Sequence, residues 1–65
     1  MSNEIITAVA KFAFTADVSY PQTMSLEPGD NMVEVETAGD GWMWGTNIKT
    51  LERGLFPESY VLVTV

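Results

Sequence analysis

The chain has no cysteine and no histidine, and only three of its 65 residues are basic. Without cysteine no disulfide can brace the fold, and without cysteine or histidine the common zinc ligand sets are missing. Catalysis that uses histidine as acid, base or partner of a nucleophile is excluded as well. The absence of cysteine is also compatible with a reducing compartment. These absences turn attention from catalysis toward binding.

Long apolar runs are missing too. Nothing in the chain approaches the roughly 20 apolar residues that cross a bilayer. The first four residues, Met1-Ser2-Asn3-Glu4, lack the basic character of a cleavable signal peptide. We expect residues 1–4 to form a flexible leader and residues 5–65 to form one small domain.

Charge is strongly one-sided. Nine acidic residues against Lys11, Lys49 and Arg53 give a net charge of −6. Such a surface opposes contact with nucleic-acid phosphates and with anionic membranes, so we expect neither partner. A basic or neutral protein partner fits better, although solubility alone explains the charge equally well.

Hydrophobic patterning predicts an all-β fold. The chain shows no sustained helical period with caps, whereas short runs of β-forming residues recur between turn residues. Five short strands in succession indicate a small barrel. The expected strands are Ile5–Phe14, Met32–Thr37, Trp42–Asn47, Arg53–Pro57 and Val61–Val65.

The segment from Thr15 to Asp30 is too long for a slack loop in so small a domain. We expect a functional arm folded as an irregular hairpin and anchored by Ala16, Met24 and Leu26. The arm ends in Glu27-Pro28-Gly29-Asp30, where Pro28 presets φ and Gly29 accepts a positive φ. In the strand that follows, we expect Val33 and Val35 to point inward, because a buried Glu34 without a partner would be costly.

Little in the chain supports catalysis. The carboxylates guarantee some close pairs, and hydrolysis by two carboxylates is formally possible, but no nucleophile is paired with a histidine base. Asp17, Asp30 and Asp40 lack the spacing of a calcium loop. We expect no enzyme activity, no bound metal and no cofactor.

Aromatic residues are too numerous for a core of this size, since the aliphatic residues already fill a five-strand barrel. Several must lie on the surface, where an exposed apolar patch usually marks a binding site. Trp42 is a better candidate for binding than for core packing, while Trp44 suits either role. Pro57, which ends a strand, and Tyr60, on the turn after it, present two stiff surfaces close together.

Four segments together resemble the Src homology 3 (SH3) family. Ala10-Lys11-Phe12-Ala13-Phe14 is similar to its ALYDY box, and Trp42-Met43-Trp44-Gly45 to its W-W-x-G segment. Met24-Ser25-Leu26 with Glu27-Pro28-Gly29-Asp30 resembles L-S-F-x-x-G-D, and Gly54 to Val61 resembles G-x-F-P-x-N-Y-V. The motifs occur in the family's order and cover nearly the whole chain.

The resemblance implies a small five-stranded barrel of two packed antiparallel sheets, with a long arm after the first strand and a short 3-10 turn before the last. It implies a cytoplasmic, monomeric, non-catalytic adaptor module of the kind found in signalling and cytoskeletal proteins. Its ligands would be proline-rich PxxP segments in the polyproline II form. The groove residues carried over by position are Phe12, Phe14, Trp42, Pro57 and Tyr60.

Departures from the family pattern bear on the ligand. Phenylalanine replaces both tyrosines of the box, which removes two hydroxyl donors. Thr23 replaces the acid that in the family meets an Arg or Lys of the ligand. Asp17, or Asp40 and Glu36 across the groove, are expected to contact basic ligand residues instead. The second strand carries one extra residue, which predicts a bulge near Asn31.

Two uses of such a barrel remain open beside peptide binding. The less polar groove could dock a folded partner, or it could pack against the parent protein and regulate it. Nucleic-acid binding by a barrel of related shape is opposed by the charge.

Overall fold

The computed structural model describes residues 6–64, so the expected leader at residues 1–4 lies outside the described residues. Five strands follow one another: β1 (Thr7–Ala10), β2 (Asn31–Gly39), β3 (Trp42–Asn47), β4 (Arg53–Pro57) and β5 (Val61–Thr64). A single 3-10 turn, η1 (Glu58–Tyr60), precedes β5. The predicted all-β barrel with its 3-10 turn is therefore confirmed.

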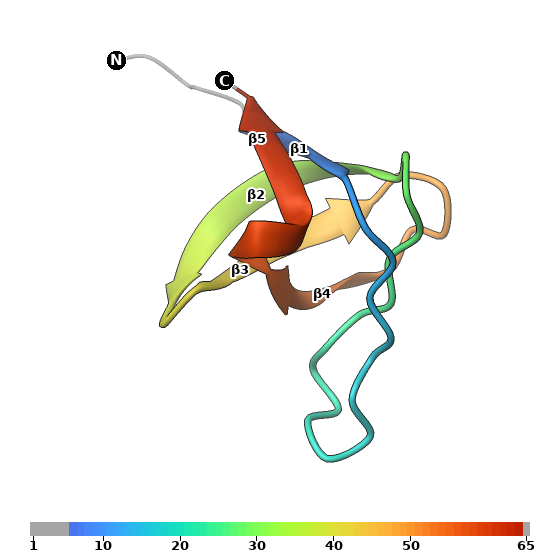
Figure 1. Cartoon of the computed structure of the whole chain (residues 1–65), viewed down its shortest axis with the longest axis vertical. Coiled ribbons are helices and arrows are strands. Elements are labelled where there is room, and N and C mark those ends of the chain that lie inside the picture. Colours follow the sequence, from blue (N-terminus) through green and yellow to red (C-terminus); the bar gives the residue numbers. More distant parts are fainter. Residues whose placement is uncertain (1–5, 65) are drawn as a thin grey trace.

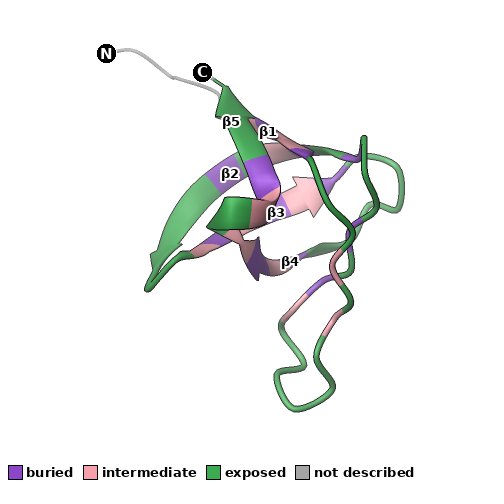
Figure 2. Ribbon diagram, viewed as in Figure 1, coloured by how far each residue is buried: buried purple, intermediate pink, exposed green. Residues whose placement is uncertain are grey.

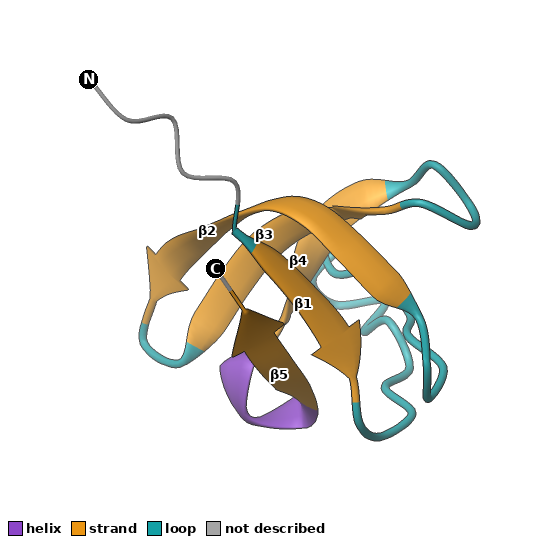
Figure 3. Cartoon of the chain, turned by 90° about the horizontal axis from the view of Figure 1, so that it is seen from above, coloured by secondary structure: helices purple, strands orange, loops and turns teal. Residues whose placement is uncertain are grey.

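All five strands are antiparallel and lie in one continuous sheet in the order β4-β3-β2-β1-β5, so hydrogen bonding joins what was expected as two sheets. The long strand β2 curves through the molecule and pairs with β1 near its start and with β3 along its length (Figures 1 and 3). This curvature wraps the sheet around one core, in which apolar side chains are removed from water.

The expected strand limits hold best where turn residues fix them. Both β3 and β4 have the predicted limits. The first strand is shorter than expected, because the chain leaves the sheet after Ala10, and Phe14 forms only an isolated bridge with Leu26 across the arm. Val65, the last residue of the expected fifth strand, lies outside the described residues.

All five strands contribute buried residues (Figure 2), and many of these residues have small or flexible side chains. Its buried members are Ala8, Ala10, Met24, Leu26, Met32, Val35, Met43, Phe56 and Val61. Of the expected anchors of the arm, Met24 and Leu26 are buried, while Ala16 is only half-buried. The three unbranched methionines fill the spaces between the curved strands.

The expectation for Val33 is wrong. Val33 is half-buried, and Met32 fills the core in its place, together with Val35. The bulge lies later than expected, between Val33 and Glu36, with Glu34 at φ 52°. One extra residue exchanges the faces of a strand, so Met32 and Val35 both point inward although they are three residues apart.

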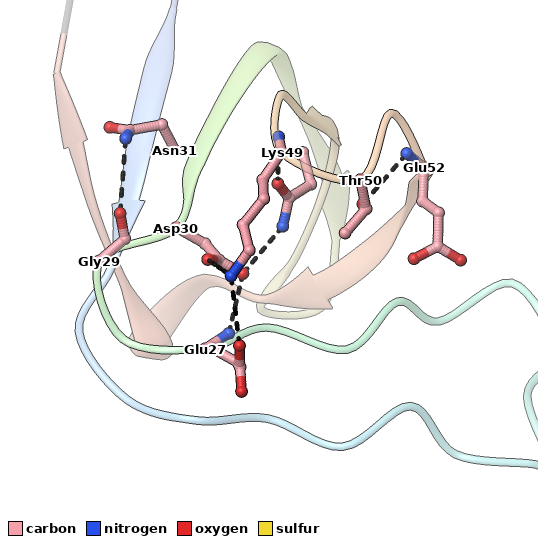
Figure 4. A network of polar contacts seen from close by, with 8 residues as sticks. Glu27, Gly29, Asp30, Asn31, Lys49, Thr50 and Glu52 are labelled. Atoms are coloured by element: carbon pink, nitrogen blue, oxygen red, sulfur yellow. Dashed lines mark hydrogen bonds and ion pairs between the residues drawn. The ribbon is translucent and has the colours of Figure 1, made fainter.

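A buried polar network ties the base of the arm to the β3–β4 turn (Figure 4). Asp30 accepts hydrogen bonds from the side-chain amide of the fully buried Asn47 at 2.9 Å and from the backbone N–H of Glu27 at 3.0 Å. Asn47 in turn accepts from the N–H of Lys49, whose ammonium pairs with Glu27 at 3.4 Å. The network holds the turn Glu27–Asp30, where Gly29 has φ 92° as predicted.

Candidate functional site

Four aromatic rings form a continuous run across one side of the barrel. Phe12 lies edge-on to Tyr60 with ring centroids 6.0 Å apart, and Tyr60 is 5.7 Å from Phe14. Phe14 contacts Trp42 edge-on at 6.0 Å. Edge-to-face geometry at these distances is the favourable arrangement for aromatic pairs.

Pro57 completes this surface, because it is the cross-strand partner of Trp42. We call the five residues Phe12, Phe14, Trp42, Pro57 and Tyr60 the aromatic strip. These are the groove residues expected from the sequence, and the structure brings them together from β3, β4, η1 and the start of the arm. Phe12 has 57% of its surface exposed, and the others are half-buried.

Backbone hydrogen bonds between distant segments fix the strip. The N–H of Lys11 donates to the carbonyl of Tyr60 at 2.8 Å, and the N–H of Glu58 donates to that of Gly41 at 2.8 Å. Phe14 exchanges two hydrogen bonds with Leu26 across the arm. The rings are therefore presented on restrained backbone, which limits the entropy lost on binding.

Beside the strip, a pocket of about 290 Å³ opens between the arm and the sheet. Its walls are Tyr20, Thr23, Trp42 and Leu55, and we call it the side pocket. Two backbone hydrogen bonds join the arm to β4 here. The N–H of Met24 donates to the carbonyl of Leu55 at 2.9 Å, and the N–H of Leu55 donates to the carbonyl of Gln22 at 2.8 Å. Trp42 is a wall of the pocket and a member of the strip, so the two surfaces are continuous.

Nothing in the sequence pattern predicts that Tyr20, Thr23 and Leu55 line a common pocket. In the sequence, Thr23 is notable only for replacing the family's acid, and Leu55 is expected only as a strand residue. The Tyr20-Pro21 pair at the far end of the arm is the one local feature of the sequence that could indicate the side pocket. The parallel bridge between Thr23 and Leu55 that forms the pocket is a contact between distant segments.

The three acids expected to meet basic ligand residues lie apart. Asp17 is on the arm, where its carboxylate accepts from the N–H of Ser19 at 2.9 Å. Glu36 is on β2 and pairs with Arg53 at 3.1 Å. Asp40 is exposed in the β2–β3 turn with φ 54°. None of the three is among the residues that line the side pocket.

Trp44 has a structural partner. The Arg53 guanidinium lies 5.8 Å from the centre of its ring. The same guanidinium donates to the carbonyl of Glu34 at 3.2 Å and to the hydroxyl of Thr46 at 2.9 Å. Arg53 thus joins β2, β3 and β4 on the outer face of the sheet and closes over Trp44.

Other kinds of site find no support in the described part of the chain. Residues 6–64 contain no group of three or more acidic side chains placed to hold a metal ion. No helix in the same range has the length and apolar character to cross a membrane.

The comparisons with known proteins agree with this geometry. The SH3 domain family model matches residues 9–58. The structure resembles the SH3 domain of the yeast actin binding protein Abp1 (TM-score 0.75, 27% identity, covering 86% of this chain and 93% of that one). It also resembles SH3 domain 1 of human Rho GTPase-activating Protein 10 (TM-score 0.76, 32% identity, covering 91% and 80%).

A third similar structure is the C-terminal SH3 domain of Myosin IB from Entamoeba histolytica, bound to the EhFP10(GEF) peptide. It has a TM-score of 0.78 at 20% identity and covers 98% of this chain and 100% of that one. At that identity the likeness shows the fold alone.

The chain belongs to the SH3 family. SH3 domains are protein–protein interaction modules, generally without catalytic activity, and the similar domain of Abp1 comes from an actin binding protein.

Proposed function

We propose that this SH3 domain binds a proline-rich segment of a partner protein along the aromatic strip. The observation that carries the proposal is the unbroken run from Phe12 through Tyr60 and Phe14 to Trp42, with Pro57 beside Trp42. A polyproline II segment is already extended and stiff, so seating it between rigid rings costs little conformational entropy. The peptide bound to the structurally similar Myosin IB domain supports a peptide ligand.

Charge selects among such ligands. With a net charge of −6, the domain attracts segments that carry Arg or Lys near their prolines. Asp17 and Asp40 are exposed acids that attract basic residues of the ligand. Glu36 is less available, because it is already paired with Arg53. The affinity is weak to moderate, because a short peptide buries little area, and it falls as salt is raised.

We also propose a setting for the domain. Residues 5–65 form the binding unit, which acts as a monomer in the cytoplasm without catalytic activity, metal or cofactor. The absence of cysteine suits a reducing compartment.

A titration with a PxxP peptide flanked by arginine tests the proposal. The amide signals of Phe12, Phe14, Trp42 and Tyr60 shift on binding, and Trp42→Ala abolishes the shifts. Trp44→Phe is the matched control, because Trp44 packs under Arg53 and lies outside the strip. Absence of any shift at millimolar peptide, or equal loss in both variants, contradicts the proposal.

A second use of the domain is docking a folded partner or the parent protein itself. The tip of the arm favours it, since Val18 is 96% exposed and Tyr20 is 64% exposed, and both are apolar. Under this alternative, Trp42→Ala removes peptide binding but leaves partner binding intact, whereas Val18→Asp removes partner binding.

A further inference from the structure

The four residues that line the side pocket carry no charge. They are Tyr20, Thr23, Trp42 and Leu55, and the ring and aliphatic carbons of these side chains make up most of the wall. A volume of about 290 Å³ falls just below the range of about 300–1,000 Å³ typical of small-molecule sites. The pocket therefore has room for one or two side chains of a ligand.

Thr23 has little hydrogen bonding left to offer a ligand. Its hydroxyl donates to the carbonyl of Tyr20 at 2.7 Å and accepts from the N–H of Asp17 at 2.8 Å. These bonds fold the tip of the arm upon itself. A guanidinium or ammonium group in the pocket would leave its water shell without meeting a carboxylate, and an unpaired charge is costly to desolvate.

The acid near the tip of the arm does not supply the missing partner. Asp17 lies on the same arm as Thr23, but it is not part of the pocket wall. Its carboxylate already accepts a hydrogen bond from the N–H of Ser19. Glu36 lies on the same face of the sheet as Leu55, through the cross-strand pairs Glu36–Trp44 and Trp44–Leu55, but its carboxylate is engaged by Arg53 at 3.1 Å. Basic ligand residues can respond to the overall negative field, but the pocket provides them with no direct partner.

The walls are positioned before any ligand arrives. Backbone hydrogen bonds at 2.8 and 2.9 Å hold the arm to Leu55 on both sides of Thr23. Trp42 is in contact with Phe14, which fixes its ring against the strip. A preformed apolar pocket gains affinity from an apolar side chain without a cost for ordering its walls.

We propose that the side pocket receives one apolar ligand side chain, of leucine or phenylalanine size, in place of the Arg or Lys expected from the family pattern. The ligand is an extended proline-rich segment whose apolar residue flanks the prolines. Trp42 is shared by strip and pocket, so a chain lying along the strip reaches the pocket within a few residues. This inference rests on the proposed function and specifies its ligand.

A peptide panel tests the inference. All peptides share one PxxP core and differ at one flanking position, which carries leucine, phenylalanine, arginine, glutamate or glycine. Two series place that position before or after the core, so that either ligand orientation is covered. In one series the leucine and phenylalanine peptides bind about five- to tenfold tighter than the glycine peptide, and tighter than the arginine peptide at 150 mM salt or above, where surface charge attraction is screened.

Variants of the pocket locate the effect. Leu55→Ala reduces the advantage of leucine over glycine to less than about twofold, while the glycine peptide keeps its own affinity for the strip. Val18→Ala is the control on the same arm, because Val18 lies outside the pocket wall and leaves the preference unchanged. Thermal unfolding of each variant confirms that it is folded under the conditions of the titration.

The results that would overturn the inference can be told apart from those that would overturn the proposed function. Equal binding of all flanking residues, or tighter binding of arginine than of leucine at high salt, overturns the inference while leaving the proposed function intact. A leucine preference that persists in Leu55→Ala overturns it as well. Failure of every peptide, including those with arginine, overturns the proposed function and the inference with it.

Discussion

Gly54 lies against the backbone of Gln22 so closely that no side chain fits between them. A Cβ atom at position 54 would stand 2.8 Å from the carbonyl oxygen of Gln22 and 2.8 Å from the Cβ of Met24. Well-packed atoms stay roughly 3.5–4.0 Å apart. The missing side chain of Gly54 is thus what allows the arm to lie on β4 and to form the side pocket.

Gly54→Ala is expected to lower the free energy of unfolding by about 1–3 kcal/mol, because the added methyl pushes the arm away from β4. Urea unfolding measures the loss, and the amide signals of Gln22 and Met24 report the displacement. Gly41→Ala is the control for the amide signals. A Cβ at Gly41 meets no atom, but φ is 83°, so this variant loses stability through backbone strain without displacing Gln22 or Met24. Unmoved signals at Gln22 and Met24 in Gly54→Ala would contradict the close approach.

Asn47→Ala is expected to destabilise the domain by about 2–3 kcal/mol, because it removes the donor to the Asp30 carboxylate inside the protein. Asn31→Ala is the matched control. Asn31 is exposed, and its side-chain amide makes a long, weak hydrogen bond of 3.4 Å to the carbonyl of Gly29. Its replacement therefore lowers the free energy of unfolding by less than about 0.5 kcal/mol. Equal losses for the two variants in chemical denaturation would show that the buried network is unimportant.

Leu51→Asn is expected to stabilise the domain by about 0.5–1 kcal/mol. Leu51 is 79% exposed and adopts φ 64°, a left-handed conformation that asparagine tolerates better than leucine. Leu62→Asn changes an exposed leucine in the extended strand β5 and brings no such gain. A lower melting temperature for Leu51→Asn than for the natural chain would refute the argument.

Phe12→Tyr is expected to tighten binding of the PxxP peptide about three- to tenfold, because it adds a hydroxyl worth roughly 1 kcal/mol to an exposed ring of the strip. Tyr60→Phe makes the opposite change beside it and weakens binding by a similar factor. Isothermal titration of both variants measures the effect. An unchanged dissociation constant for Phe12→Tyr would mean that the missing hydroxyl does not limit affinity.

Local chemistry made several features predictable. The limits of β3 and β4 follow from glycine and proline beside short β-forming runs, and the turn at Gly29 follows from Pro28 before it. The surplus of aromatic residues indicated a surface site, and the motif pattern selected the members of the aromatic strip. These features depend on residues that are close together in the sequence, or on motifs that can be recognised directly in it.

Long-range packing decided the rest. Alternation within β2 could not reveal that Met32, and not Val33, fills the core, because the bulge at Glu34 depends on pairing with β3. Nor could the sequence show that Thr23 meets Leu55, since the two residues touch only when the arm folds back onto the sheet. The sequence by itself determined an all-β domain with an aromatic binding surface. The uncharged side pocket arose from tertiary structure alone, because its walls come from segments that only the folded barrel brings into contact.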